Sequence, residues 1–335
     1  MEQIRAVLQE YGITSVEIEP ITDRLYRVID PYHNQYALKK STLTEKSVMN
    51  WKHVLHTANS NNLVNVSPVY LTKQGELYYE RNNEIFYLTP WLLAKSEPKN
   101  LGKIFQAIGF IHRTTKKTQS FSPESTTTSF KEYKKHCDSA RLSLLSYVEQ
   151  FEQRRYMSPF ELLVCTQFHV LNNVFRELIR KLDQLISNLD EDDGVWSTSL
   201  CHGNLRMDHI IESNQLLFIN WENASYHNAI QDLVSFFKNN VIYYDSPTDD
   251  LLNNFANYMN ENSLESSEIY LLTIYLLDPT YYMDLIRTYY DGNDTSMIDQ
   301  IKKLQQTYRQ LIFALKFSQH VETEYESLSL EDLES

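Results

Sequence analysis

The chain has 335 residues, of which 42% are hydrophobic and 22% are charged, and its formal net charge is -13. This composition is typical of a folded globular protein and excludes a largely disordered one. The acidity argues against a nucleic-acid or anionic-membrane partner, because both need clustered Lys and Arg, and no apolar run of the sequence approaches the roughly 20 residues of a membrane span.

The cysteines and the N-terminal segment indicate where the protein is made. Cys137, Cys165 and Cys201 are far apart and form no CxxC pair, which is typical of a reducing compartment. Residues 1–11 predict an amphipathic helix with interspersed charges and no apolar region of a signal peptide. We therefore expect synthesis in the cytoplasm.

Short strands dominate the first 90 residues. Alternating and aromatic runs predict the strands, and Thr44 and Gly75 mark the start of a helix and a turn. We expect a β-rich N-terminal lobe over residues 1–90. Its predicted strands are 16–19, 25–29, 36–39, 69–72, 76–79 and 85–88, and its second helix is 44–59.

The pattern becomes helical after Thr89-Pro90-Trp91. A loop-and-strand segment, 199–222, interrupts the helices, and the polar segment 114–128 predicts a loop. We expect a helical C-terminal lobe over 91–325 and an acidic, frayed tail over 326–335, and hence an α+β fold with the two lobes of a protein kinase. The predicted helices are 101–113, 130–151, 159–189, 232–240, 248–260, 266–277, 279–290 and 295–321.

The segment 201–222 carries the most informative motif. It contains H-G-N-L-R-M-D-H from residue 202 and I-N-W-E from residue 219. It resembles the aminoglycoside phosphotransferase and choline kinase-like family, whose catalytic loop reads H-G-D-x-x-x-x-N and whose next strand reads I-D-W/F-E/D. The resemblance puts Asn204 at the catalytic Asp, His209 at the metal-binding Asn, and Asn220 at the metal-binding Asp.

Each of these three changes removes a chemical function. An Asn amide cannot take a proton, and loss of a general base typically costs roughly 10²–10⁴ in rate. Magnesium needs oxygen ligands, usually including carboxylates, whereas the nitrogen of His209 suits zinc or nickel better. We therefore expect no catalytic residue at Asn204, His209 or Asn220, no bound metal, no resident cofactor and no phosphoryl transfer.

Two further residues of the motif have structural roles. Asp232, in Asn228–Leu233, matches the family's G-x-x-x-D-L, and the resemblance implies that it braces the catalytic loop. His202 is expected to hydrogen-bond the backbone of the loop. The spacing of His202 and His209 is not that of a zinc chelate.

The nucleotide clamp looks vestigial in the sequence. The only glycine before Lys39 is Gly12, so no glycine-rich phosphate loop precedes it. Lys39, in Ala37-Leu38-Lys39, matches the A-x-K strand that reaches nucleotide phosphates in kinases, and Glu45 on the next helix is its candidate partner. An equally weighted alternative is that Lys39 is an ordinary surface lysine and that Glu45 is an ordinary residue at the start of a helix.

An active enzyme is the alternative. Asp208 and Glu222 lie beside the altered positions, and either can bind a metal in principle, although Asp208 is expected to face solvent next to Arg206. This reading requires ATP and magnesium and a small-molecule or protein hydroxyl as substrate. A third reading keeps the cleft as a receptor for a metabolite without chemistry.

Over roughly residues 5–320 the chain also resembles the CotS-type spore coat proteins of endospore-forming bacteria. The resemblance implies synthesis in the mother cell, deposition in the spore coat and other coat proteins as partners. Together with the altered loop, it favours a pseudokinase that acts as a scaffold or binding module in coat assembly. The segments that carry it are 36–40, 87–91, the helix 101–113 with His112, 201–204 and 219–222.

Overall fold

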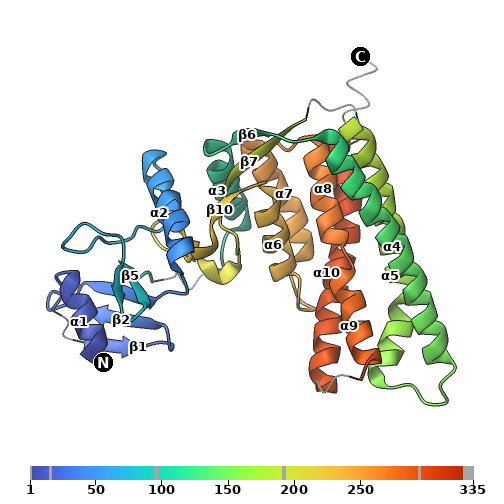
Figure 1. The fold of residues 1–335 in the computed structure, drawn as a ribbon, viewed down its shortest axis with the longest axis horizontal. Helices are drawn as coiled ribbons and strands as arrows, with labels where there is room; N and C mark the ends of the chain where they lie inside the picture. Colours follow the sequence, from blue (N-terminus) through green and yellow to red (C-terminus); the bar gives the residue numbers. More distant parts are fainter. Residues whose placement is uncertain (1, 15–16, 94–97, 191–193, 293–295, 327–335) are drawn as a thin grey trace. The chain divides into compact units, whose positions relative to one another are not determined.

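The structure is a computed structural model, and it describes residues 2–14, 17–93, 98–190, 194–292 and 296–326 (Figure 1). The chain divides into two compact units. The first contains Met1–Thr115 and Ser199–His227, and the second contains Lys116–Thr198 and Asn228–Ser335. The loop-and-strand segment therefore belongs to the same unit as the N-terminal strands. The predicted α+β class, with a small antiparallel sheet and a larger helical part, is confirmed.

The first unit contains an antiparallel sheet in the order β1-β2-β3-β5-β4. Side chains alternate across a strand, so Leu38 and Val28 of neighbouring strands are buried against the helix α1 (Glu2–Glu10), while Lys39 lies on the other face. The apolar core that fixes the sheet is therefore separate from the face that carries Lys39. The strands are β1 (Glu17–Pro20), β2 (Leu25–Ile29), β3 (Gln35–Lys40), β4 (Tyr79–Arg81) and β5 (Glu84–Pro90).

Two helices complete the first unit. Helix α2 (Glu45–Ser60) begins at a capping box made by Thr44 and Ser47 and buries an apolar stripe that includes Trp51 and Leu55. Helix α3 (Leu101–Thr114) begins at Asn100, whose side chain accepts a hydrogen bond from the Lys103 amide. Both helix starts lie within one residue of those predicted from the sequence.

The segment after Ser199 alternates short strands and single turns. The hairpin of β8 (Ile210–Glu212) and β9 (Leu216–Phe218) follows the turn η1 (Met207–His209), and the turn η2 (Trp221–Asn223) precedes β10 (Ser225–His227). Residues Ser199–Cys201, the last part of β7 (Val195–Cys201), pair with β10. This local pairing fixes both ends of the candidate catalytic loop.

The second unit is mainly helical. Its long helices α4 (Pro123–Glu152) and α5 (Pro159–Asp190) lie side by side and antiparallel, as Figure 1 shows in green. The other elements are β6 (Lys117–Ser120), paired with Val195–Thr198 of β7, and the helices α6 (Ile230–Asn240), α7 (Thr248–Glu261), α8 (Ser266–Leu277), α9 (Thr280–Tyr290) and α10 (Met297–Val321) followed by a π-helical turn (Glu322–Glu326). Among the described residues, none of the helices has the length and apolarity to span a membrane.

Four sequence expectations need correction or lie outside the described residues, and the first is the strand 76–79, in place of which β4 begins at Tyr79. Residues 69–72 form no strand and pair only through a bridge between Tyr70 and Leu88. The predicted loop 114–128 instead contains β6 and the start of α4, because Ser122 caps that helix and Pro123 suits its first turn. The frayed tail lies outside the described residues from 327 onward.

Candidate functional site

The candidate catalytic loop is held by the backbone and by His202. Gly203 has φ +77°, and a Cβ there would lie 2.2 Å from the backbone oxygen of Asn223, so only glycine fits. His202 is buried, its Nε2 lies 2.7 Å from the Ile219 carbonyl oxygen, and the Asn204 amide donates to its Nδ1 at 3.3 Å. The predicted backbone hydrogen bonding of His202 is confirmed.

His209 has the same kind of structural role. Its Nδ1 lies 2.9 Å from the Asn204 carbonyl oxygen, and its ring stacks on that of His202 with centroids 5.5 Å apart. Burial lowers the pKa of His209 and outweighs the hydrogen bond to Asn204, which favours the charged form. The family's metal-binding position is therefore occupied by an imidazole whose burial favours the neutral form.

Asn220 binds Lys39. Asn220 has φ 67° and ψ 48°, the left-handed region that Asn tolerates better than most residues. Its Oδ1 accepts a hydrogen bond of 2.7 Å from Lys39 Nζ, which joins residues far apart in the sequence but within the first unit. The amide oxygen at the family's metal-binding position therefore accepts a hydrogen bond from a lysine.

Glu222 completes the pairing of Lys39. Its Oε1 lies 2.9 Å from Lys39 Nζ and accepts from the Tyr87 hydroxyl at 2.8 Å, and its Oε2 accepts from the Thr42 hydroxyl at 2.9 Å. Burial opposes ionisation of this carboxyl group, but the charge of Lys39 and these hydrogen bonds outweigh it and lower the pKa of Glu222. Burial and the nearby Glu222 also raise the pKa of Tyr87 well above its ordinary value.

The structure gives Lys39 a partner other than Glu45. The Lys39 side chain is only 24% exposed and pairs with Glu222. Glu45 is an exposed residue of the first turn of α2. The suggested Lys39–Glu45 pair is therefore replaced by Lys39–Glu222, because η2 brings a carboxylate to the lysine while Glu45 remains at the surface.

The turn between β1 and β2 takes the place of a glycine-rich phosphate loop. The Thr22 hydroxyl accepts hydrogen bonds from the backbone amides of Arg24 at 3.2 Å and Leu25 at 3.1 Å. The amides of Ile21 and Thr22 donate to the Leu25 carbonyl. Phosphate loops bind through free backbone N–H groups, whereas this turn uses its amides internally.

A cavity of about 330 Å³ adjoins Lys39 and Asn220 within the first unit. Its size lies at the small end of ligand pockets. Its lining is mostly apolar and aromatic: Thr22, Arg24, Leu25, Ala37, Lys39, Trp51, Leu55, Ser67, Val69, Tyr87, Thr89, Pro90, Trp91, Leu92, Ile211, Ile219, Asn220 and Trp221.

The chemistry of the site does not fit a magnesium–triphosphate. The positions that bind metal in the family offer the imidazole of His209 and the amide of Asn220, and the nearby carboxylate of Glu222 is held by Lys39, Tyr87 and Thr42. Magnesium requires octahedral coordination by oxygen ligands, which usually include a carboxylate. The side chain of Asp208 is 61% exposed and pairs with Arg206 at 2.9 and 3.0 Å, as expected from the sequence, so it supplies no replacement.

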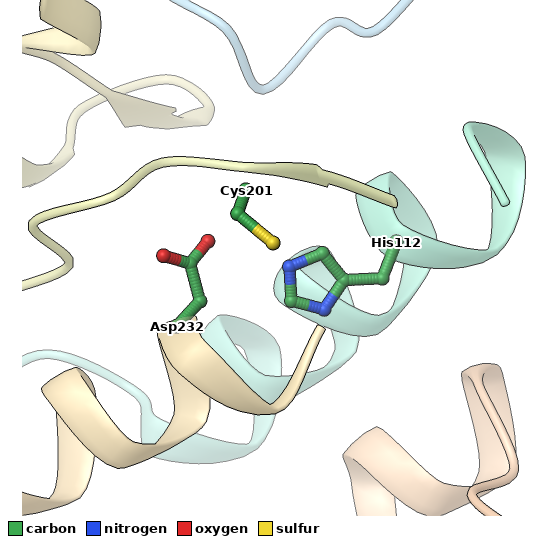
Figure 2. Close-up of side chains that lie close together, drawn as sticks. All are labelled: His112, Cys201 and Asp232. Atoms are coloured by element: carbon green, nitrogen blue, oxygen red, sulfur yellow. The ribbon is translucent and has the colours of Figure 1, made fainter. Parts of the chain in front are cut away.

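Figure 2 labels three buried side chains, His112, Cys201 and Asp232. His112 of α3 and Cys201 of β7 are both buried, with ligand-type atoms within 4.8 Å of each other. The Cys201 thiol donates to the His227 carbonyl at 3.5 Å, which links the start of the loop to β10. Asp232, also labelled in Figure 2, is buried in α6 of the second unit and 2% exposed.

Comparison with known proteins decides the family. The model of the phosphotransferase enzyme family matches residues 18–260, which includes β1 to β5, the catalytic-loop segment and α6. The chain belongs to this family. The superfamily and the kinase-like fold predicted from residues 201–222 are therefore confirmed. No curated protein matches the chain.

Solved structures show the same phosphotransferase fold. An aminoglycoside phosphotransferase from Alicyclobacillus acidocaldarius shares 15% identity over 96% of each chain, with a TM-score of 0.69. The spectinomycin phosphotransferase in complex with AMP shares 15% identity over 94% of this chain and 98% of its own, with a TM-score of 0.57. Amicoumacin kinase shares 13% identity over 92% of each chain, with a TM-score of 0.52.

Some residues of the site had no motif to reveal them. Thr42 and Ser67 lie on separate segments, and only the fold brings Thr42 to Glu222 and Ser67 to the wall of the cavity. Thr22 was detectable in principle, because a Thr before Asp-Arg at a turn favours side-chain-to-backbone hydrogen bonds. The sequence singles out both Lys39 and Glu222, but it does not predict that the two side chains form an ion pair.

Proposed function

We propose that the chain is a catalytically inactive phosphotransferase-fold protein, a pseudokinase that acts as a scaffold or binding module without a resident metal. One observation carries the proposal. Lys39, which matches the phosphate-contacting lysine of kinases, is bound by Asn220 and Glu222. Asn220 stands at the family's metal-binding Asp and Glu222 lies in the turn η2 that follows it, so the carboxylate of Glu222 neutralises the lysine.

The loss of the general base acts on the same chemical step. Asn204 stands where the family has its catalytic Asp, and an amide cannot accept the proton of an attacking hydroxyl. The backbone of Asn204 is used by His202 and His209, so this residue serves to fix the loop. These contacts hold the loop, while the family's proton acceptor is absent from it.

The setting we propose is assembly of the bacterial spore coat. The support is the sequence resemblance to CotS-type proteins over roughly residues 5–320, which includes segments 36–40 and 219–222 on either side of the Lys39 pairing. The protein is made in the mother-cell cytoplasm, and its partners are other coat proteins. A tagged chain expressed during sporulation is expected in the coat fraction, and its recovery only in the mother-cell cytosol contradicts this setting.

A phosphoryl-transfer assay tests the loss of catalysis. Purified full-length chain is incubated with labelled ATP, magnesium and a panel of aminoglycosides, choline and coat proteins. We expect neither labelled product nor ATP hydrolysis above the protein-free control. Transfer that the Asn220→Ala substitution abolishes would show that this site is active and would contradict the proposal.

A further inference from the structure

The second unit contains a cavity of about 250 Å³ between the helices α4, α5 and α9 (Figure 1). Its described lining residues all belong to this unit, so it is separate from the cavity beside Lys39. Ligand sites of helical proteins commonly lie between packed helices, and pockets for drug-sized molecules begin at about 300 Å³. The volume of this cavity therefore suits a smaller molecule.

Contacts at two levels of α4 fix the walls of the cavity. Before the cavity along α4, the Tyr133 hydroxyl donates to Asp278 Oδ1 at 2.9 Å, in the connection between α8 and α9. At its far end the Tyr290 hydroxyl donates to Gln150 Oε1 at 2.6 Å, and the rings of Tyr147 and Tyr290 lie 5.2 Å apart. The cavity is therefore preformed, and a ligand does not have to separate the helices to enter it.

The floor of the cavity is apolar. Phe175 and Cys137 line it and are buried, and Ala140 and Met283 also line it. Burial raises the pKa of the Cys137 thiol to about 11, so the thiol is neutral and behaves as a small apolar group. Such a floor favours an aliphatic or aromatic group of a ligand, because burial removes its apolar surface from water.

Hydroxyl groups of Ser139, Ser143 and Thr280 line the cavity but donate within the protein. Ser143 donates to the Ser139 carbonyl at 3.0 Å, and Ser139 donates to the Lys135 carbonyl at 3.1 Å. The Thr280 hydroxyl donates to Asp278 at 2.6 Å. Because a hydroxyl has only one proton to donate, the orientation of a ligand depends more on the charged groups of the lining than on these hydroxyls.

Two opposite charges lie together in the lining of the cavity. Asp284 and Arg287 of α9 form an ion pair one helical turn apart, and their side chains are 45% and 64% exposed. An exposed ion pair contributes little to stability, so a ligand can replace it. Arginine binds a carboxylate through two parallel hydrogen bonds, and a carboxylate accepts from an ammonium group. The pair therefore suits a ligand that carries both charges, whereas a ligand of one charge is repelled by one of the two residues.

We infer that this cavity binds a free apolar α-amino acid of the class of leucine or phenylalanine, with its carboxylate on Arg287 and its ammonium group on Asp284. The zwitterion matches both charges of the ion pair, and its side chain contacts the apolar floor at Phe175. The inference goes beyond the proposed loss of phosphoryl transfer and does not depend on it, because the cavity lies in the second unit and uses none of the residues around Lys39.

Calorimetric titration of the full-length chain tests the inference. The probes are L-leucine, L-phenylalanine, glycine and N-acetyl-L-leucine amide. We expect leucine or phenylalanine to bind. Glycine lacks the apolar side chain and the amide lacks both charges, so each is expected to bind about tenfold more weakly, or less, than the better of the first two.

Variants of the ion pair and of the floor locate the site. Asp284→Asn and Arg287→Gln each remove one charge and are expected to weaken the amino acid about tenfold. Asp249→Asn is the matched control, because Asp249 forms an exposed ion pair with Lys316 elsewhere in the second unit, and it is expected to leave the affinity unchanged. Ala140→Leu fills the cavity and is expected to abolish binding while the chain unfolds at the same or a higher temperature.

Several results would overturn the amino-acid site. They are the absence of leucine and phenylalanine binding at millimolar concentration, equal affinities for leucine and either glycine or the amide, and binding that survives Ala140→Leu. Unchanged affinity in Asp284→Asn and Arg287→Gln also overturns it, and this result stands even if Ala140→Leu is destabilised, because substitutions in an exposed ion pair change the unfolding temperature little. Labelled product in the phosphoryl-transfer assay overturns the pseudokinase alone.

Discussion

Lys39 of β3 and Glu222 of η2 form an ion pair with a separation of 2.9 Å, and the Glu222 side chain is 9% exposed. The Tyr87 hydroxyl donates to the same carboxylate oxygen at 2.8 Å. A kinase of this family is expected to use its lysine for the nucleotide phosphates. In this chain the lysine joins the sheet to the segment after the catalytic loop and thereby stabilises the first unit.

Glu222→Gln tests the structural importance of this ion pair. The substitution keeps the shape of the side chain but leaves the charge of the partly buried Lys39 without its carboxylate. Removing one partner of a buried pair costs roughly 3–5 kcal/mol, and partial exposure of the lysine reduces the cost to about 2 kcal/mol. Urea unfolding measures the change, and the double variant Lys39→Met/Glu222→Gln is expected to recover part of it. Equal unfolding free energies for Glu222→Gln and the unsubstituted chain would show that the Lys39–Glu222 ion pair does not stabilise the fold.

The same carboxylate predicts a dependence of stability on acid. The pKa of Glu222 is lower in the folded chain than in the unfolded chain, which is near 4.3. The unfolded state therefore binds the proton more readily, and the contribution of Glu222 is present above that pH and is lost as the pH falls through the folded pKa. Between about pH 6 and about pH 3, the unsubstituted chain is expected to lose more unfolding free energy than Glu222→Gln. Parallel curves for the two proteins would refute this.

His209 predicts a second pH effect in a higher window. Burial lowers the pKa of His209 from its ordinary value of about 6.5. At a pH just below that value, the ring therefore stays neutral more readily in the folded chain than in the unfolded chain. Stability from the neutral ring is complete above that value and is lost as the pH falls through the lowered pKa. In urea unfolding at about pH 7.5 and about pH 5.5, His209→Asn is expected to lose less stability than the unsubstituted chain. A larger loss in His209→Asn would contradict the assigned burial.

Gly203→Ala tests the geometry of the loop. An added Cβ meets the Asn223 backbone oxygen at 2.2 Å, and the residue has φ +77°. Steric overlap with backbone and left-handed strain together are expected to cost about 3 kcal/mol. Gly75→Ala is the matched control, because Gly75 has φ +82° but nothing within 4 Å of an added Cβ, so only about 1 kcal/mol of strain is expected. Similar losses in both variants would argue against the close approach of the loop to Asn223.

Restoring the family's residues at positions 204, 209 and 220 tests whether these three changes account for the loss of magnesium-dependent ATP binding. The triple variant Asn204→Asp, His209→Asn and Asn220→Asp returns two carboxylates and one amide oxygen to the motif. Because magnesium prefers oxygen ligands with carboxylates, the variant is expected to gain magnesium-dependent ATP binding of at least tenfold over the unsubstituted chain. The single variant His209→Asn serves as control, since it restores no charge. Failure of the triple variant to respond to magnesium would show that the defect extends beyond these three positions.

The sequence predicted those parts of the site that depend on local spacing. His202 and Asn204 are two residues apart, as are Arg206 and Asp208, so these contacts followed from local spacing. The partner of Lys39 was not predictable in this way, because Glu222 is brought to it only by the tertiary fold. Sequence spacing favoured the nearer Glu45, which the structure places at the surface.

Secondary structure shows the same division. Helix α2 was predicted closely, since Thr44 and the apolar stripe around Trp51 are strong local signals. The start of α4 was missed, because the Ser- and Thr-rich composition suggested a loop although Ser122-Pro123 is a good helix start. The expected strand 69–72 did not form, because Tyr70 contributes only an isolated bridge to β5.

We propose that the cavity beside Lys39 does not assemble a magnesium–nucleotide complex, because its cation and its carboxylate bind each other. Calorimetric titration of the full-length chain with ATP, in the presence and absence of magnesium, tests this most directly. We expect magnesium to leave the affinity for ATP unchanged. ATP binding that magnesium strengthens tenfold or more, and that Asn220→Ala reverses, would contradict it.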